Sequence, residues 1–158
     1  MKIILHFVVH KEMYRLITAS LVAQPIKCPA DIVFVLDESG SIGSTNFDLM
    51  KSFVSQLVSR MDIDSGNTRV ALVTFSSSIG TSFDFNAYTT VASVQAAISA
   101  LSYSGGGTNT AAALAHVRTS MLTSAAGDRS NVPNIVVVLT DGHSNNPTLT
   151  TVSIELSV

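Results

Sequence analysis

The chain has 158 residues, which is enough for one domain with a sizeable hydrophobic core. Its formal net charge is −2 and its nine Lys and Arg residues form no basic stripe, which argues against a nucleic-acid or anionic-membrane binder. A single cysteine, Cys28, excludes a Cys-rich metal site and a disulfide within the chain; a free thiol and an intermolecular or lost partner both stay open.

Residues 1–29 are predicted to be a leader segment and linker, followed by one domain over residues 30–158. Lys2 precedes an apolar run, and a second apolar run over residues 16–23 ends in small residues, as in a cleavable signal segment. The charged residues Lys11 and Glu12 interrupt that pattern, so a disordered or misassigned leader is the alternative. Neither apolar run is long enough to span a bilayer, so no membrane span is expected.

The first half of the domain reads as strand, helix, strand. Residues 32–36 form an apolar run without polar alternation, which predicts a strand buried on both faces. Residues 44–46, Ser-Thr-Asn, are expected to cap a helix whose apolar positions between Phe47 and Met61 recur at helical spacing. After a polar break, residues 70–75 read as a second strand.

The second half adds a hairpin, two helices and a strand. Residues 79–85 alternate like an edge strand, and the link Ser76-Ser77-Ser78 is so short that an antiparallel hairpin is expected. Thr89-Thr90 is expected to cap a helix, a second helix should run over about 110–123, and residues 135–140 read as a fourth strand. The pattern predicts an α/β fold, a doubly wound, mostly parallel sheet with helices on both faces and one antiparallel edge strand.

The strongest chemical signal is the sequence Asp37-Glu38-Ser39-Gly40-Ser41, directly after the first strand. In open α/β sheets, ligands bind at the carboxyl ends of the strands. One carboxylate and two hydroxyls there suit a hard divalent cation such as Mg²⁺. The same residues are also common in turns, where their side chains bond only to nearby backbone.

Two later segments favour the metal interpretation. A glycine-rich loop over residues 104–107 leads into Thr108-Asn109-Thr110, where Thr108 and Thr110 offer a hydroxyl ligand and a helix cap. Asp141 follows the strand 135–140 as Asp37 follows the strand 32–36. Neighbouring parallel strands would bring the two carboxylates to one edge of the sheet, with the hydroxyls of Ser39, Ser41 and Thr108.

These motifs, in this order, resemble the metal-ion-dependent adhesion site of von Willebrand factor type A domains, above all the extracellular members in collagen-associated proteins, matrilins and integrin α subunits. The resemblance runs from about residue 29 to residue 151. It implies that Ser39, Ser41 and Thr108 bind the metal directly, and that Asp37 and Asp141 act mostly through water. The metal would be Mg²⁺, with Mn²⁺ or Ca²⁺ as alternatives.

The function that the resemblance implies is binding, not catalysis. A carboxylate of a partner protein would fill the open coordination position of the cation. The partner would be an extracellular matrix protein such as collagen, or a cell-surface receptor, and the protein would be secreted. His116 is not expected to be a ligand, because no second His or Cys accompanies it. His143, just beyond Gly142, is expected to be a rim contact.

Two other functions remain open at this point. A phosphoryl-transfer enzyme of doubly wound fold could use an Asp after the first strand and a glycine-rich loop, but Ser39 stands where a second Asp is wanted and no Lys follows the glycines. A non-binding, truncated fragment is the third hypothesis. A complete domain of this family continues further beyond Asp141, so the fold is expected to be incomplete at its C-terminal side, with one bare apolar edge on the strand 135–140.

Overall fold

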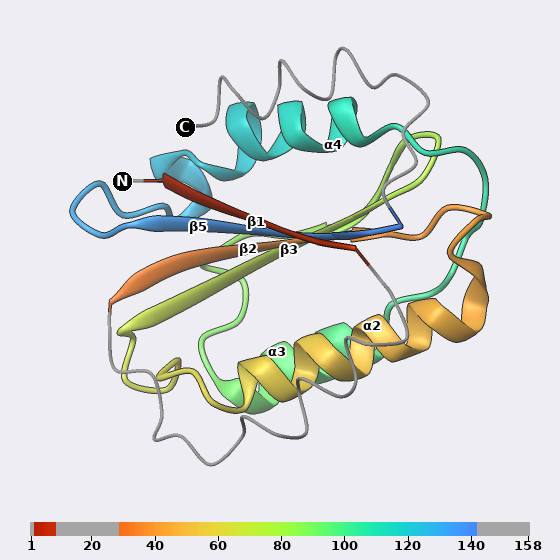
Figure 1. Cartoon of the computed structure of the whole chain (residues 1–158). Helices are drawn as coiled ribbons and strands as arrows, with labels where there is room; N and C mark the ends of the chain where they lie inside the picture. The colour runs from red at the N-terminus through yellow and green to blue at the C-terminus, as the bar shows by residue number, and fades with distance from the viewer. Residues whose placement is uncertain (1, 9–28, 142–158) are drawn as a thin grey trace.

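The computed structural model describes residues 2–8 and 29–141 of the chain. Its strands are β1 (Lys2–Val8), β2 (Ala30–Asp37), β3 (Thr68–Phe75), β4 (Ile79–Phe83) and β5 (Asn134–Thr140). They form one sheet in the order β1-β5-β2-β3-β4, as Figure 1 shows edge-on. The first four strands in that order run parallel, and β4 pairs antiparallel with β3. The predicted mostly parallel sheet with one antiparallel edge strand is confirmed.

Helices cover both faces of the sheet. Helices α2 (Gly43–Val58) and α3 (Val91–Ser99) lie on one face, and α4 (Thr110–His116) lies on the other (Figure 1). Helix α4 continues directly into a π-helical turn, η1 (Val117–Met121), and a short 3₁₀ turn, η2 (Ser124–Ala126), follows. The predicted doubly wound architecture is therefore present.

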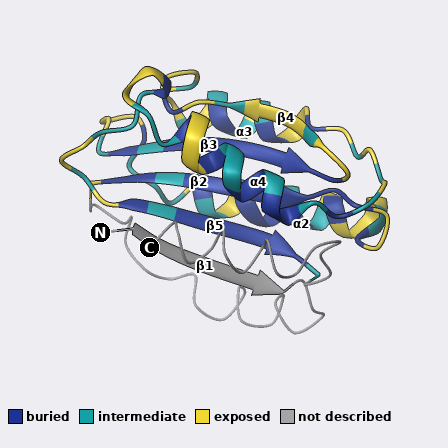
Figure 2. Ribbon diagram, turned by 90° about the horizontal axis from the view of Figure 1, so that it is seen from above, coloured by how far each residue is buried: buried dark blue, intermediate teal, exposed yellow. Residues whose placement is uncertain are grey.

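The side chains of β2 alternate between two hydrophobic cores, because successive residues of a strand point to opposite faces. Phe34 belongs to the core that contains Phe47 of α2, and Val35 belongs to the core that contains Leu114 of α4. Figure 2 shows β2, β3 and β5 as mostly buried and β4 as mostly exposed. The central strands are thus packed on both faces, which fixes the positions of the loops at their carboxyl ends.

The predicted bare edge on the last strand is wrong for this structure. β1 pairs in parallel with β5 along its whole length, from Lys2 opposite Asn134 to Val8 opposite Thr140. The apolar run of the predicted leader has strand propensity, and its backbone groups bond to the otherwise unpaired edge of β5. The segment that was expected to lie outside the domain therefore contributes a strand to the sheet.

The start of helix α3 was predicted correctly, and the start of helix α2 was not. Thr90 caps α3, as expected, and Ser93 completes a reciprocal capping box that was not predicted. The capping residues proposed for α2 are wrong, because that helix begins at Gly43 and Ile42 precedes it without a side-chain cap. Asn46 lies inside the first turn instead, where its amide donates a 2.8 Å hydrogen bond to the Ile42 carbonyl.

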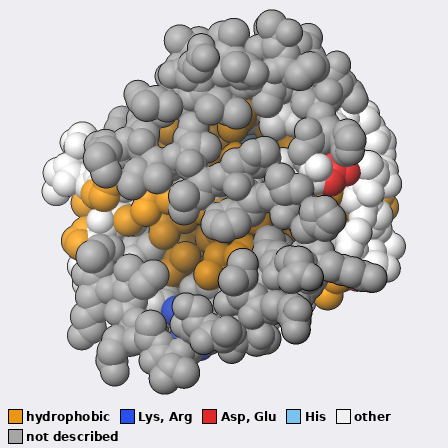
Figure 3. Space-filling model, viewed as in Figure 1, with side chains coloured by type: hydrophobic (Ala, Val, Ile, Leu, Met, Phe, Trp, Pro, Cys, Tyr) orange, Lys and Arg blue, Asp and Glu red, His pale blue; other side chains and the backbone are white. Residues whose placement is uncertain are grey.

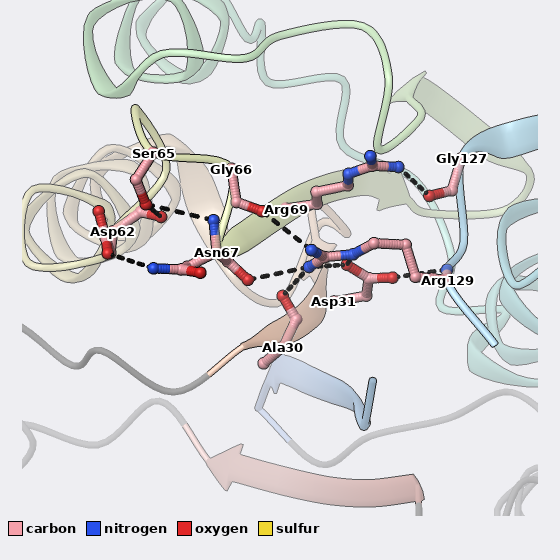
Figure 4. A network of polar contacts seen from close by, with 9 residues as sticks. All are labelled: Ala30, Asp31, Asp62, Ser65, Gly66, Asn67, Arg69, Gly127 and Arg129. Atoms are coloured by element: carbon pink, nitrogen blue, oxygen red, sulfur yellow. Dashed lines mark hydrogen bonds and ion pairs between the residues drawn. The ribbon is translucent and has the colours of Figure 1, made fainter. Parts of the chain in front are cut away.

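A polar clamp closes the end of the sheet where β2 begins (Figure 4). Asp31 is fully buried, and the backbone N–H and guanidinium of Arg129 donate to its carboxylate at 2.7–2.9 Å. The same guanidinium also donates to the carbonyl groups of Ala30, Gly66 and Asn67. This clamp ties the loop before β5 to the start of β2, at the opposite end of the strands from Asp37.

Figure 3 shows apolar side chains gathered in the middle of one face, with the visible acidic atoms toward the end of the molecule where β2 and β5 finish. Among the residues that the structure describes, no helix is long and apolar enough to cross a bilayer. Residues 9–28 of the predicted leader (1–29), which include Cys28, lie outside the described residues, as does the tail over 142–158, which includes His143.

Candidate metal centre

Asp37 is the last residue of β2, and its carboxylate is held on both oxygens. The Ser39 backbone N–H donates to Oδ1 at 2.8 Å, and the Thr140 hydroxyl donates to Oδ2 at 2.7 Å. The residue is fully buried. Burial raises the pKa of the Asp37 carboxyl above its usual value, the hydrogen bonds from Ser39 and Thr140 oppose this rise, and the negative charge of Asp141 adds to it.

Asp141 comes to this position through the strand register. Leu36 pairs with Leu139 in the parallel ladder between β2 and β5, so the next residues on the two strands are Asp37 and Thr140. Asp141 follows Thr140 and is half-buried. Its negative charge raises the pKa of the Asp37 carboxyl, as a smaller effect than burial.

Ser39 and Ser41 present their hydroxyls side by side, with 3.2 Å between the two Oγ atoms. Ser39 is fully buried, whereas Ser41 is exposed. The Tyr103 hydroxyl donates a 3.1 Å hydrogen bond to the Ser39 carbonyl and thereby holds the loop that follows Asp37. The loop after Asp37 thus presents one buried and one exposed hydroxyl next to each other.

The glycine-rich loop packs directly onto this motif through backbone hydrogen bonds. Gly40 N–H donates to the Gly106 carbonyl at 2.8 Å, and Gly105 N–H donates to the Glu38 carbonyl at 3.0 Å. Gly106 has a φ of 102°, and a Cβ on Gly40 would lie 3.2 Å from the Gly106 carbonyl oxygen. The positive φ favours glycine at position 106, and the close approach of the two loops favours it at position 40.

Thr108 lies two residues beyond this contact and is buried. The helix that follows is capped by Asn109, whose side chain accepts from Ala112 N–H. The proposed capping role of Thr110 is therefore wrong, since Thr110 is already the first residue of α4. The cap fixes the start of α4 two residues after Thr108.

Strand register and hydrogen bonds place Asp37, Ser39, Ser41 and Asp141 at the carboxyl ends of β2 and β5. The glycine-rich loop that leads into Thr108 packs on Gly40 and Glu38 of the same motif. His116 lies at the end of α4, outside this group. Within the described part of the chain, no three His, Cys, Asp or Glu side chains form a cluster that could hold a metal ion. The local chemistry is that of hydroxyls with two carboxylates.

Several residues that shape this centre were missed by sequence reasoning. Thr140 precedes Asp141 directly, and pairing β2 with β5 in register would have placed it beside Asp37. Tyr103 and Ser77 carry no comparable signal. Tyr103 reaches the Ser39 carbonyl across 64 positions of sequence, and Ser77 reaches the glycine-rich loop from the β3–β4 turn.

Comparison with known proteins places this geometry in a family. The family model for "von Willebrand factor type A domain" matches residues 31–157. The collagen alpha-4(VI) chain of Mus musculus is 42% identical over 120 residues, which are 75% of this chain and 5% of that protein. Matrilin-4 of Homo sapiens is 40% identical over 119 residues, which are 73% of this chain and 19% of that protein. The chain therefore spans only a small part of the length of these relatives.

Solved structures agree with this result. Proximal thread matrix protein 1 from the mussel byssus matches with a TM-score of 0.73 and 31% identity, over 78% of this chain and 33% of that one. A structure of the same byssus protein described as having a zinc-occupied MIDAS motif matches with a TM-score of 0.75 and 28% identity, over 86% of this chain and 38% of that one.

Proposed function

Because the chain belongs to the von Willebrand factor type A domain family, we propose that it is a divalent-cation-dependent protein-binding module of the extracellular matrix. The cation would lie at the carboxyl ends of β2 and β5. Ser39, Ser41 and Thr108 would bind it through their hydroxyls, and Asp37 and Asp141 would hold it mostly through bound water.

The observation that carries this proposal is the pair of carboxyl groups, Asp37 and Asp141. Asp37 is fully buried, the donors to its carboxylate are the uncharged Ser39 N–H and Thr140 hydroxyl, and the negative charge of Asp141 adds to the rise in its pKa. A bound cation would offset the repulsion. The Ser39 and Ser41 hydroxyls, 3.2 Å apart, add the neutral oxygen ligands that a hard cation such as Mg²⁺ prefers.

This donor set also explains how a partner would bind. Bound through few direct carboxylates, the cation would supply a Lewis-acidic coordination position for an acidic side chain of the partner. The chain's own residues hold the surroundings rigid: Thr140 and Ser39 orient the Asp37 carboxylate, and the glycine-rich loop closes over Gly40. The exposed Ser41 marks the side from which a partner would approach.

We propose a matrix protein such as a collagen, or a cell-surface receptor, as the partner, and a secreted location for the protein. The relatives support this, since they are collagen chains and matrilins. They also favour a binding module over an enzyme. The metal assignment gains support from the byssus protein, which carries zinc in its motif.

A thermal-shift titration tests the metal site. After removal of metal with EDTA, Mg²⁺ at about 100 times its dissociation constant should stabilise the protein by about 2.7 kcal/mol. Ser39→Ala should abolish the response, and Ser44→Ala, which changes an exposed serine on α2, should preserve it. Equal responses from wild type and Ser39→Ala, or phosphoester hydrolysis that depends on Asp37, would contradict the proposal.

A binding assay tests the partner class. Immobilised collagen should retain the wild-type protein in Mg²⁺ and release it in EDTA, and Ser39→Ala should not bind. Retention that is insensitive to EDTA would argue against recognition through a bound cation.

A further inference from the structure

The turn between β3 and β4, Ser76-Ser77-Ser78, touches the glycine-rich loop on both sides of Thr108. The Ser77 hydroxyl accepts a 2.8 Å hydrogen bond from the N–H of Gly107, the residue just before Thr108. The Ser76 carbonyl accepts a 2.7 Å hydrogen bond from Asn109 N–H, just after it. Both backbone neighbours of Thr108 are therefore held by the same turn.

These two bonds differ in kind. The bond from Asn109 ends on a backbone carbonyl, which any residue at position 76 would provide. The bond from Gly107 ends on a side chain, so it depends on a hydroxyl at position 77. The fit there is close, because a Cβ on Gly106 would lie 3.1 Å from the Ser77 Oγ atom.

The other end of the loop is already fixed to the Asp37–Ser41 motif, through Gly105 N–H and the Gly106 carbonyl. The hydrogen bond to the Ser77 hydroxyl therefore holds the backbone between Gly106 and Thr108 through a side chain. A shift of the Gly106–Gly107 peptide plane would move Thr108 unless the φ and ψ of Gly107 compensated, since only that one residue lies between them.

We infer that Ser77 is a positioning residue for the metal centre: its hydroxyl holds the Gly107 peptide so that the Thr108 hydroxyl stays in place to bind the cation. This inference rests on the proposed function. Residues that orient metal ligands without touching the metal typically contribute about 10- to 100-fold to affinity. A single neutral hydrogen bond changes an equilibrium constant by about tenfold at most, so Ser77 should lie at the low end of that range.

Three variants separate positioning from general stability. Ser77→Ala removes the acceptor, Ser77→Thr keeps a hydroxyl, and Ser78→Ala changes the neighbouring exposed serine, whose backbone carbonyl is retained. The affinity for Mg²⁺ is measured by calorimetry, and the melting temperature is measured in EDTA. We expect Ser77→Ala to weaken Mg²⁺ binding about 10-fold, and Ser77→Thr and Ser78→Ala to bind like the wild type.

The outcomes are distinct. A wild type that binds no divalent cation overturns the proposed function and this inference together. A wild type that binds Mg²⁺, with Ser77→Ala within about twofold of it, overturns the inference alone; twofold is less than one net hydrogen bond. A loss in Ser77→Ala that Ser77→Thr does not rescue, or that matches an equal loss of stability in EDTA, also overturns the inference.

Amide hydrogen exchange tests the same inference on the wild-type protein, so it does not depend on whether a variant folds. Amide exchange at Gly107 should slow when Mg²⁺ is added, because a cation bound to Thr108 would stabilise the bonded arrangement of the loop. Unchanged exchange at Gly107, while Mg²⁺ binds, would contradict a positioning role for Ser77.

Discussion

The Thr140 hydroxyl donates a 2.7 Å hydrogen bond to the Asp37 carboxylate across 103 positions of sequence, and both residues are buried. This bond joins the ends of β2 and β5 at the candidate metal centre. It shows that the strand residue before Asp141, and not only Asp141, shapes the centre.

Thr140→Val should weaken both the fold and the centre. Valine keeps the shape but leaves a buried carboxylate oxygen without its donor, which costs about 1–3 kcal/mol. Urea unfolding in EDTA measures the loss, and Thr140→Ser, which keeps the hydroxyl, should recover most of it. Equal stability of Thr140→Val and wild type would show that the bond contributes little.

Asp37→Asn should raise the stability of the metal-free protein at neutral pH and abolish its response to Mg²⁺. Burial raises the pKa of Asp37 in the folded state, so between its usual and its raised value the folded protein binds more protons than the unfolded chain. The free energy of unfolding of the wild type therefore falls as the pH rises through that window, and the penalty is complete above it.

The advantage of Asp37→Asn over wild type should accordingly shrink as the pH falls through that window. Asparagine can still accept from Ser39 N–H and donate to the Thr140 hydroxyl, so little else changes. Thermal unfolding of both proteins in EDTA across this pH range checks the prediction. A variant that is less stable than wild type at neutral pH would contradict it.

Tyr103→Phe should reduce Mg²⁺ affinity more than it reduces stability. It removes the donor to the Ser39 carbonyl but keeps the ring, whose centroid lies 5.9 Å from that of Phe47. The free energy of Mg²⁺ binding should become less favourable by about 0.5–1.5 kcal/mol, the net contribution of one hydrogen bond. Tyr88→Phe is the matched control, because Tyr88 is equally half-buried and its ring packs on Phe83, away from this loop. If both variants bind Mg²⁺ alike, Tyr103 has no special role.

Arg129→Ala should destabilise the fold without altering the metal response. It leaves the fully buried Asp31 carboxylate without its ion-pair partner, which typically costs about 3–5 kcal/mol. Arg118→Ala, at an exposed position of η1, should change stability little. Denaturant unfolding with and without Mg²⁺ should show the same Mg²⁺-dependent gain in wild type and Arg129→Ala; loss of that gain would link the clamp to the centre.

Most of the fold could be predicted from the apolar runs of the sequence and the spacing of its motifs. Residues 32–36 and 135–140 lack polar alternation, and each precedes an aspartate, so a parallel sheet that brings Asp37 and Asp141 to one edge followed from local pattern. The order of the motifs led to the same family that the comparisons report.

Other features depend on contacts that local pattern does not encode. To predict the pairing of β1 with β5, one would have had to know that the N-terminal segment adds a strand to the edge of β5. Helix α2 begins at Gly43, so residues 44–46, which have a high capping preference, lie inside its first turn. Tyr103 and Ser77 act through hydrogen bonds to backbone groups far away in sequence, so their residue types alone gave no signal.

The most direct measurement of the metal centre uses Mn²⁺ as a paramagnetic substitute for Mg²⁺ in solution NMR. Equimolar Mn²⁺ should broaden the amide signals of Ser39, Ser41, Thr108 and Asp141 together, and excess Mg²⁺ should restore them. The Arg129 amide, in the clamp at the opposite end of the strands, should stay sharp. Broadening that spares Thr108 or Asp141 while affecting Ser39, or no broadening at all, would contradict a single cation bound by this set of residues.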